Sequence, residues 1–235
     1  MLPVLLGDAA TPVHRVLVLG AHCDDIEIGC GGTILRLVEQ CAPLSVYWLV
    51  LSGSKERAGE AAASAAAFLS GADGQVVVRG FRDGFFPWSG AEIKEVFEEL
   101  KGLVAPDVIF THRREDAHQD HRLVAELTWN TFRDHLILEY EIPKYEGDLT
   151  APNLFVPLDE RTGARKVELL LKGFPSQRHR QWFDADAFWS ILRLRGIESN
   201  SPTRYAEGFS CRKLVLPLHA VGDPRAVQVR GAEPQ

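Results

Sequence analysis

A run of four aliphatic residues, Val16 to Leu19, leads directly into a turn that carries a histidine and three acidic side chains. The run predicts a buried β-strand, and the helical spacing of apolar residues after the turn predicts a helix from about residue 33 to 40. The turn then lies at the carboxyl end of the strand, where open α/β sheets bind their ligands. Charged groups are costly to bury there unless a cation or hydrogen bonds compensate them. The turn, His22 to Glu27, therefore indicates a metal site.

Strands and helices are predicted to alternate along most of the chain. Apolar stretches predict further strands at 44–51, 75–79, 107–111 and 136–142. Amphipathic or alanine-rich stretches predict helices at 55–70, at 92–104 and from 120 to 132. The last third is less regular, with strands expected at 153–158 and 204–216 and helices at 166–174 and 186–195. This pattern is typical of an α/β, Rossmann-like three-layer fold with a mostly parallel sheet and helices on both faces.

The chain is long enough to bury one sizeable core, since 46% of its 235 residues are apolar and 25% are charged. We expect one domain over residues 1–219 and a flexible tail over 220–235. The net charge of −6 offers no basic stripe for a nucleic acid, so no such partner is expected.

The location of the protein is predicted from three further features. No apolar run is long enough to span a membrane, and the first ten residues carry no basic segment of the kind that opens a secretion signal. The four cysteines show no paired spacing, which suits a reducing compartment. We therefore expect the protein in the cytoplasm.

A second cluster of histidines and aspartates follows the fourth predicted strand, over residues 111–122. The first and fourth strands of such a sheet can present their loops to one crevice, so the two clusters are expected to converge. His118 and His121 can face the same side of a helix start, and Asp120 can orient one of them through its ring N–H.

The two clusters together resemble the signature motifs of the PIG-L/LmbE-like zinc-dependent N-deacetylases, which remove acetyl groups from N-acetylglucosamine conjugates and related acylamino sugars. The first motif reads A-H-C-D-D-I-E-I-G-C-G-G-T, where the family usually has A-H-P-D-D, and the second contains H-Q-D-H. The resemblance extends from residue 16 to about residue 209. It implies a hydrolase of a small-molecule acetylamino-sugar conjugate, with Zn²⁺ as cofactor and Fe²⁺ or Co²⁺ as alternatives. It also implies a homo-oligomer, such as a trimer or hexamer.

The same resemblance implies which residues hold the metal, namely His22, Asp25 and His121. Two imidazoles and one carboxylate that leave an open position are also what metal-assisted hydrolysis requires on chemical grounds. Cys23 stands where the family usually has proline, and it is either a packing substitution or a thiolate beside the metal.

By resemblance, Asp24 would be the general base that takes a proton from the attacking water. His118 would stabilise the oxyanion together with the metal, while Asp120 would hold His118 and favour its charged form. Either Asp24 or His118 could protonate the leaving amine. The alternative for Asp24 and Asp25 is that they only cap the following helix.

Arg57 and Asp83 are candidates for substrate contacts. The alternative for Arg57 is an ion pair with Glu60, and the alternative for Asp83 is the shaping of a turn before Gly84. The aromatic residues at 81–88 form either the wall of a pocket or a small hydrophobic plug. The glycines at 29, 31 and 32 lack the spacing of a phosphate-binding loop and are expected to serve a tight turn.

Two alternative functions remain at this point. One is a metal-dependent amide hydrolase acting on a non-sugar N-acyl substrate, because substrate choice depends on variable loops. The other is a sugar- or nucleotide-binding module without catalysis, which would carry no metal.

Overall fold

The computed structural model describes residues 4, 6 and 12–215, so the tail predicted over 220–235 lies outside the described residues. Within them, seven strands form one sheet in the order β3-β2-β1-β4-β5-β7-β6. Their bounds are β1 Arg15–Gly20, β2 Ser45–Val50, β3 Asp73–Val78, β4 Val108–His112, β5 Leu136–Tyr140, β6 Leu154–Leu158 and β7 Tyr205–Cys211.

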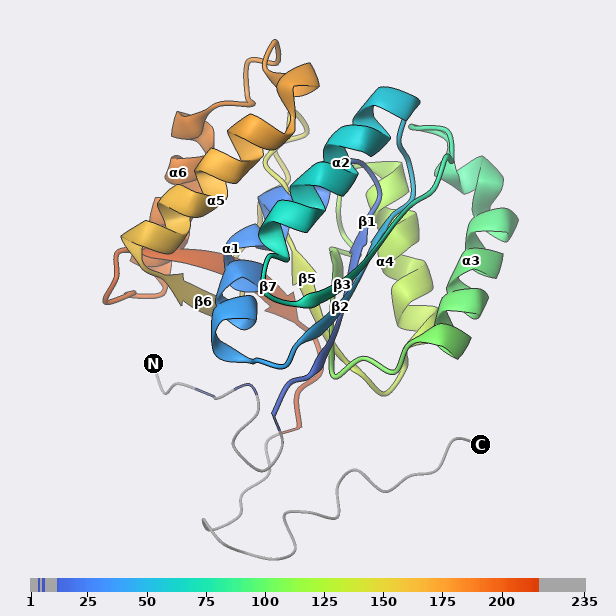
Figure 1. The fold of residues 1–235 in the computed structure, drawn as a ribbon, viewed down its shortest axis with the longest axis horizontal. Helices are drawn as coiled ribbons and strands as arrows, with labels where there is room; N and C mark the ends of the chain where they lie inside the picture. Colours follow the sequence, from blue (N-terminus) through green and yellow to red (C-terminus); the bar gives the residue numbers. More distant parts are fainter. Residues whose placement is uncertain (1–3, 5, 7–11, 216–235) are drawn as a thin grey trace, which may run out of the picture.

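The first five strands are parallel, and only β7 runs antiparallel to its neighbours β5 and β6. The helices are α1 Asp25–Gln40, α2 Lys55–Phe68, α3 Gly90–Leu103, α4 Gln119–Thr131, α5 Glu160–Gly173 and α6 Ala185–Glu198, with short 3-10 helices η1 Phe86–Ser89 and η2 Pro175–Gln177. The mostly parallel α/β sheet expected from the alternation is confirmed, as Figure 1 shows.

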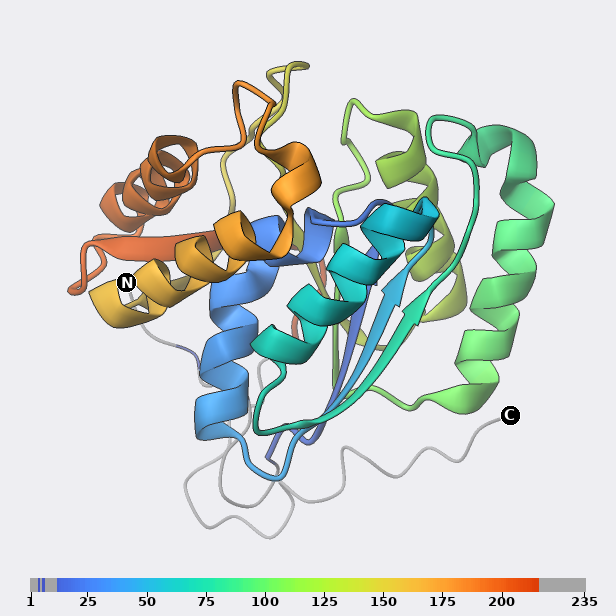
Figure 2. The same ribbon diagram turned by 45° about the horizontal axis from the view of Figure 1, so that its top comes forward.

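Helices cover both faces of the sheet and so divide the core into two layers (Figure 2). Alternate residues of β1 show the division, because Val16 and Val18 pack with α1, α2 and α5, whereas Leu17 and Leu19 pack with α3 and α4. A strand buried on both faces needs apolar residues at every position, which explains the unbroken apolar run.

Helix α1 begins at Asp25, about two turns earlier than the sequence predicts. The three glycines expected to serve a tight turn instead lie inside this helix, where neighbouring elements approach its backbone. A Cβ atom at Gly29 would lie 2.2 Å from the Tyr140 ring, and one at Gly32 would lie 2.4 Å from Leu158. Close packing therefore outweighs the low helix propensity of glycine.

A buried ion pair crosses the middle of α1. Lys166 of α5 donates to the Ile28 carbonyl and to Glu207 of β7, each at 2.6 Å. The Glu207 carboxylate also accepts the backbone N–H groups of Gly32 at 2.8 Å and Thr33 at 2.6 Å. The ion pair thus forms hydrogen bonds with a backbone carbonyl and two backbone N–H groups in the interior of α1, where such groups usually bond only to each other.

Strands β1 and β4 are adjacent and parallel, with Val16 paired to Val108. The helices that follow them pack on opposite faces, so the strand order reverses at this point, where open α/β sheets usually bind their ligands. The turn after β1 and the loop after β4 meet there. No described helix has the length and apolar character needed to cross a membrane.

Candidate metal centre

Three of the predicted site residues converge at this edge. His22 lies in the turn after β1, Asp25 is the first residue of α1, and His121 lies in the first turn of α4. His22 Nδ1 is 3.1 Å from His121 Nε2 and 3.4 Å from Asp25 Oδ2, and the last two atoms are 3.5 Å apart. Ligands about 2.0–2.1 Å from a tetrahedral zinc ion lie about 3.3 Å from one another. The triangle therefore fits such an ion.

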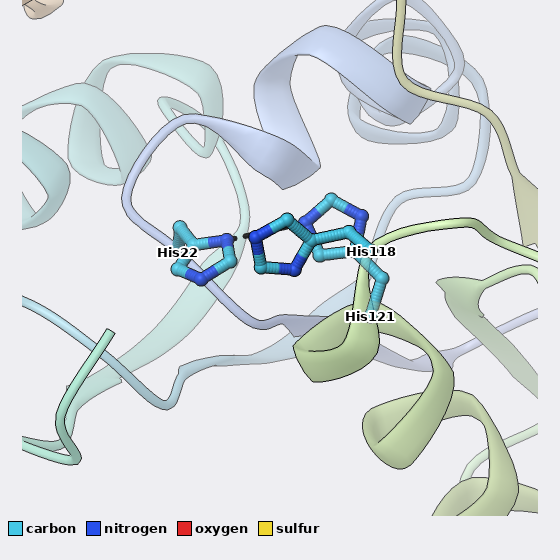
Figure 3. Close-up of side chains that lie close together, drawn as sticks. All are labelled: His22, His118 and His121. Carbon is cyan, nitrogen blue, oxygen red and sulfur yellow. Dashed lines mark hydrogen bonds between the residues drawn. The ribbon is translucent and has the colours of Figure 1, made fainter. Parts of the chain in front are cut away.

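The outer nitrogens of both imidazoles face carboxylates. His121 Nδ1 lies 3.1 Å from Asp116 Oδ2, and His22 Nε2 lies 3.1 Å from Asp83 Oδ1 and 3.2 Å from Asp120 Oδ2. These contacts assign the ring protons of the neutral imidazoles to the outer nitrogens. When His22 is also neutral, the inner nitrogens direct lone pairs at each other and at a carboxylate oxygen, and a metal ion between them can bind all three. Figure 3 shows the rings of His118 and His121, from the start of α4, turned towards His22.

The two imidazoles differ in their protonation states. Burial lowers the pKa of His121 to about 4, so its imidazole is neutral near pH 7. Burial alone would raise the pKa of Asp25, but the imidazoles of His121 and His112 hold it well below its usual range. Burial would lower the pKa of His22, yet Asp120, Asp25 and Asp83 raise it well above its usual value. A proton and a metal ion therefore compete for His22.

The described residues contain three groups whose possible ligand atoms lie within 4.8 Å of one another: His22, His118 and His121; His22, Asp83, His118 and Asp120; and Asp25, His112 and His121. His112 Nε2 accepts the backbone N–H of Ala21 at 3.0 Å, so its lone pair is already occupied. His112 thus supports the turn, and His22 is the imidazole that completes the set with Asp25 and His121.

Asp24 belongs to none of these groups of described residues and occupies a strained position. It precedes α1 with φ 125° and ψ −21°, outside the regions favoured by residues with a Cβ atom, and its side chain makes no capping hydrogen bond. Its buried carboxylate instead lies 3.2 Å from Arg57 Nη2, which also donates to the Cys23 carbonyl at 2.5 Å. Burial and the neighbouring Asp25 raise the pKa of Asp24 well above its usual range.

Arg57 therefore contacts the first motif directly, and the alternative pairing with Glu60 is wrong. Glu60 instead accepts hydrogen bonds from the backbone N–H and hydroxyl of Ser176. Cys23 is no thiolate ligand either, because its buried thiol donates to the Ser52 carbonyl and burial raises its pKa to about 12.

The contacts of Asp120 differ from the expectation. Its carboxylate faces His22 and accepts the backbone N–H groups of Gly84 at 2.7 Å and Phe86 at 3.1 Å, while only its backbone N–H reaches His118 Nδ1, at 3.3 Å. His118 precedes α4 as its cap, and its ring lies near the Asp120 carboxylate without a hydrogen bond between the two side chains. An Nδ1 atom that accepts the Asp120 N–H leaves the ring proton of His118 on Nε2.

Asp83 is exposed and contacts His22, and Gly84 after it has φ +77°, so a turn is also present at this point. In the same loop, Phe86 is buried and packs against Phe81, with ring centroids 6.3 Å apart. These two rings confirm the plug interpretation for part of the aromatic segment.

Sequence reasoning missed a second layer of support from the loop after β5. Lys144 Nζ lies 3.0 Å from Asp116 Oδ2 and 2.6 Å from Asp148 Oδ1, and Asp148 accepts the Ala117 N–H at 2.7 Å. This network fixes the carboxylate that orients His121. Neither Lys144 nor Asp148 stands in a recognisable motif, so no sequence signal marks them.

Residues 17–132 match the family model described as "PIG-L: GlcNAc-PI de-N-acetylase". Three solved structures share the fold. The conserved protein TT1542 from Thermus thermophilus has a TM-score of 0.64 at 22% identity, over 86% of this chain and 96% of that one. The N,N'-diacetylchitobiose deacetylase from Pyrococcus horikoshii has a TM-score of 0.63 at 19% identity, over 85% and 84%. GalB, the 4-carboxy-2-hydroxymuconate hydratase from Pseudomonas putida, has a TM-score of 0.64 at 17% identity, over 88% and 100%.

A deacetylase and a hydratase thus share this fold, so the fold by itself does not select a reaction. The family follows from the matched segment, which contains both histidine and aspartate motifs, and from their convergence on one site. The segment 17–132, which carries both motifs, thus belongs to the PIG-L/LmbE family.

Proposed function

We propose that this protein is a metal-dependent hydrolase that removes the N-acetyl group from an acetylamino-sugar conjugate. The observation that carries the proposal is the triangle of inward-facing ligand atoms from His22, Asp25 and His121, 3.1–3.5 Å apart. The description of the matching family model supports the reaction class.

The donor set fits Zn²⁺, because two imidazole nitrogens and one carboxylate oxygen are a common catalytic set for this ion. Such a set selects only weakly among divalent metals, so Fe²⁺ and Co²⁺ are alternatives. When bound, the ion would polarise the amide carbonyl and make the attacking water more acidic.

The residues around the triangle supply the proton transfers. Asp24 would accept a proton from the attacking water, and its buried position, fixed by Arg57, suits a general base because its pKa is raised. His118 would donate from Nε2 to the oxygen on which negative charge develops. Asp120 would act through His22 by holding its outer nitrogen.

The test compares metal content and acetate release in the same preparations. Chelation should abolish acetate release from an N-acetylglucosamine conjugate, and added Zn²⁺ should restore it. Asp24→Asn should keep its metal but lose turnover by about 10²–10⁴-fold, the usual contribution of a general base. Asp186→Asn, an exposed replacement of the same kind on α6, should match the wild type. A near-normal rate in Asp24→Asn would rule out this mechanism.

The substrate panel separates the remaining functions. Release of acetate only from N-acyl amino acids would place the activity in the non-sugar class. Ligand binding with neither metal nor turnover would identify a binding module. The cytoplasmic location and the trimer or hexamer expected from the sequence stay predictions.

A further inference from the structure

Two aromatic side chains stand exposed on the loop that follows β3. Trp88 is 71% exposed and Phe85 is 39% exposed, and their ring centroids are 5.6 Å apart. We refer to Phe85 and Trp88 as the aromatic platform. Large apolar side chains that lie together in solvent mark binding surfaces more often than isolated ones do.

The platform is attached to the candidate metal centre on both sides of Phe85. The backbone N–H groups of Gly84 and Phe86 both donate to the Asp120 carboxylate, which also contacts His22. The Phe86 ring is buried, with its centroid 5.9 Å from that of His22. The platform therefore begins one residue away from groups that hold a proposed metal ligand in place.

Hydrogen bonds hold the backbone that carries the platform before any ligand arrives. The backbone N–H of Trp88 donates to the Phe85 carbonyl at 3.0 Å, and the side-chain amide of Gln119 donates to the Gly84 carbonyl. The Arg82 guanidinium lies 3.6 Å from the centroid of the Phe85 ring and covers one of its faces. Trp88 is then the larger free aromatic surface, and a ligand that contacts it need not order the loop.

We propose that the aromatic platform binds the group attached to the acetylamino sugar, and that this group is a ring with an apolar face. This inference rests on the proposed function and narrows its substrate class to conjugates that carry such a ring. Indole faces pack well against flat apolar surfaces, whether these belong to an aryl group or to the C–H face of a second sugar. A small alkyl conjugate could not cover Trp88.

Binding of the deacetylated products tests the platform without turnover. Calorimetry would compare the phenyl, disaccharide and methyl glycosides of glucosamine with the zinc-loaded protein. The wild type should bind the ring-bearing compounds about 3- to 10-fold more tightly than the methyl glycoside, the range expected for one aromatic contact. If the phenyl glycoside gains more affinity over the methyl glycoside than the disaccharide does, the ring is aromatic. If the disaccharide gains more, the ring is a second sugar.

Substitutions at Trp88 then assign the preference. Trp88→Ala should bring the affinity ratio close to one, and Trp88→Phe should recover most of it. Leu103→Ala removes an equally exposed side chain, 68% exposed, from the end of α3 and should keep the wild-type ratio. Acetate release from the acetylated forms is measured separately, so loss of the proposed function and loss of the platform give different results.

Either of two outcomes would overturn the inference: the absence of any ring preference in the wild type, or an unchanged affinity ratio in Trp88→Ala. If the unchanged ratio is accompanied by a smaller assembly of Trp88→Ala in gel filtration, the aromatic platform is a contact between copies of the chain instead.

Discussion

Helix α1 touches two buried charged clusters that differ in how their hydrogen-bonding groups are matched. In the middle of the helix, Glu207 accepts from two backbone N–H groups, a hydroxyl and Lys166, so every acceptor meets a donor. At the first turn, the inner nitrogens of His22 and His121 and the Asp25 carboxylate lie 3.1–3.5 Å apart, and the donors that reach them are the His22 backbone N–H, 2.7 Å from Asp25 Oδ2, and a proton on the His22 ring.

The difference separates a structural cluster from a binding site. A matched ion pair needs nothing further and ties α1 to α5 and β7. Acceptors that converge on one point need a shared cation, which is a proton on His22 or a metal ion, so they indicate a binding site. Substitutions in the matched cluster should therefore destabilise the fold, whereas substitutions in the other cluster should mainly remove metal binding.

The largest effect is expected from breaking the matched cluster. Lys166→Met leaves the Glu207 carboxylate buried without its cation, which should lower the free energy of unfolding by about 3–5 kcal/mol in urea titrations. Removing both charges with Lys166→Met and Glu207→Gln should recover part of this loss. Lys172→Met, on the exposed side of α5, should cost less than about 1 kcal/mol. If Lys166→Met changes the free energy of unfolding only slightly, the ion pair with Glu207 is not a structural cluster.

Breaking the unmatched cluster should remove metal binding and largely spare the metal-free fold. Zn²⁺ at 100 times its dissociation constant should stabilise the wild type by about 2.7 kcal/mol, and Asp25→Asn should lose this gain. Without metal, the variant should lose less stability than Lys166→Met does, because an amide can still donate to a facing imidazole lone pair, although the charge that the imidazoles stabilise is gone. Unfolding with and without Zn²⁺ measures both. A large loss in the metal-free variant would mean that this cluster, too, is structural.

A smaller effect is expected at Glu27, the carboxyl of α1 whose Oε1 atom has no hydrogen-bond partner among the described residues. Burial raises the pKa of Glu27 to about 7, against a smaller opposing effect of Ser64. Because the folded-state pKa is raised, its stability contribution is complete below the unfolded value near 4.5 and is lost as the pH rises through 7.

Glu27→Gln should remove this dependence. Measured without metal, the wild type should lose about 2 kcal/mol relative to the variant between pH 5 and pH 8. Parallel stability profiles for the two proteins would show that Glu27 is ionised in the folded state and has a partner after all.

The sequence predicted the parts of the fold that depend on local patterns. The apolar runs gave β1 and β4, and the acids and imidazoles after both runs predicted that the two clusters converge, while the choice of His22 and His121 within them came from the family resemblance. Spacing in a helix start also predicted that His118 and His121 lie together, as their ring centroids 4.7 Å apart confirm.

What the sequence did not predict depends on distant partners. The start of α1 was misplaced because its glycines are explained by Tyr140 and Leu158, far along the chain. The carboxylate of Asp120 was paired with the wrong imidazole, since the loop at Gly84 decides its direction. Such tertiary contacts leave no periodic signal in a single sequence.

Crystals of the zinc-loaded protein, measured across the zinc absorption edge, would show whether one cation lies among His22 Nδ1, Asp25 Oδ2 and His121 Nε2. One strong anomalous peak is expected about 2.0–2.2 Å from each of these three atoms. A peak on the other side of the His22 ring, between Asp83 and Asp120, would contradict this placement, as would crystals with no peak at either place.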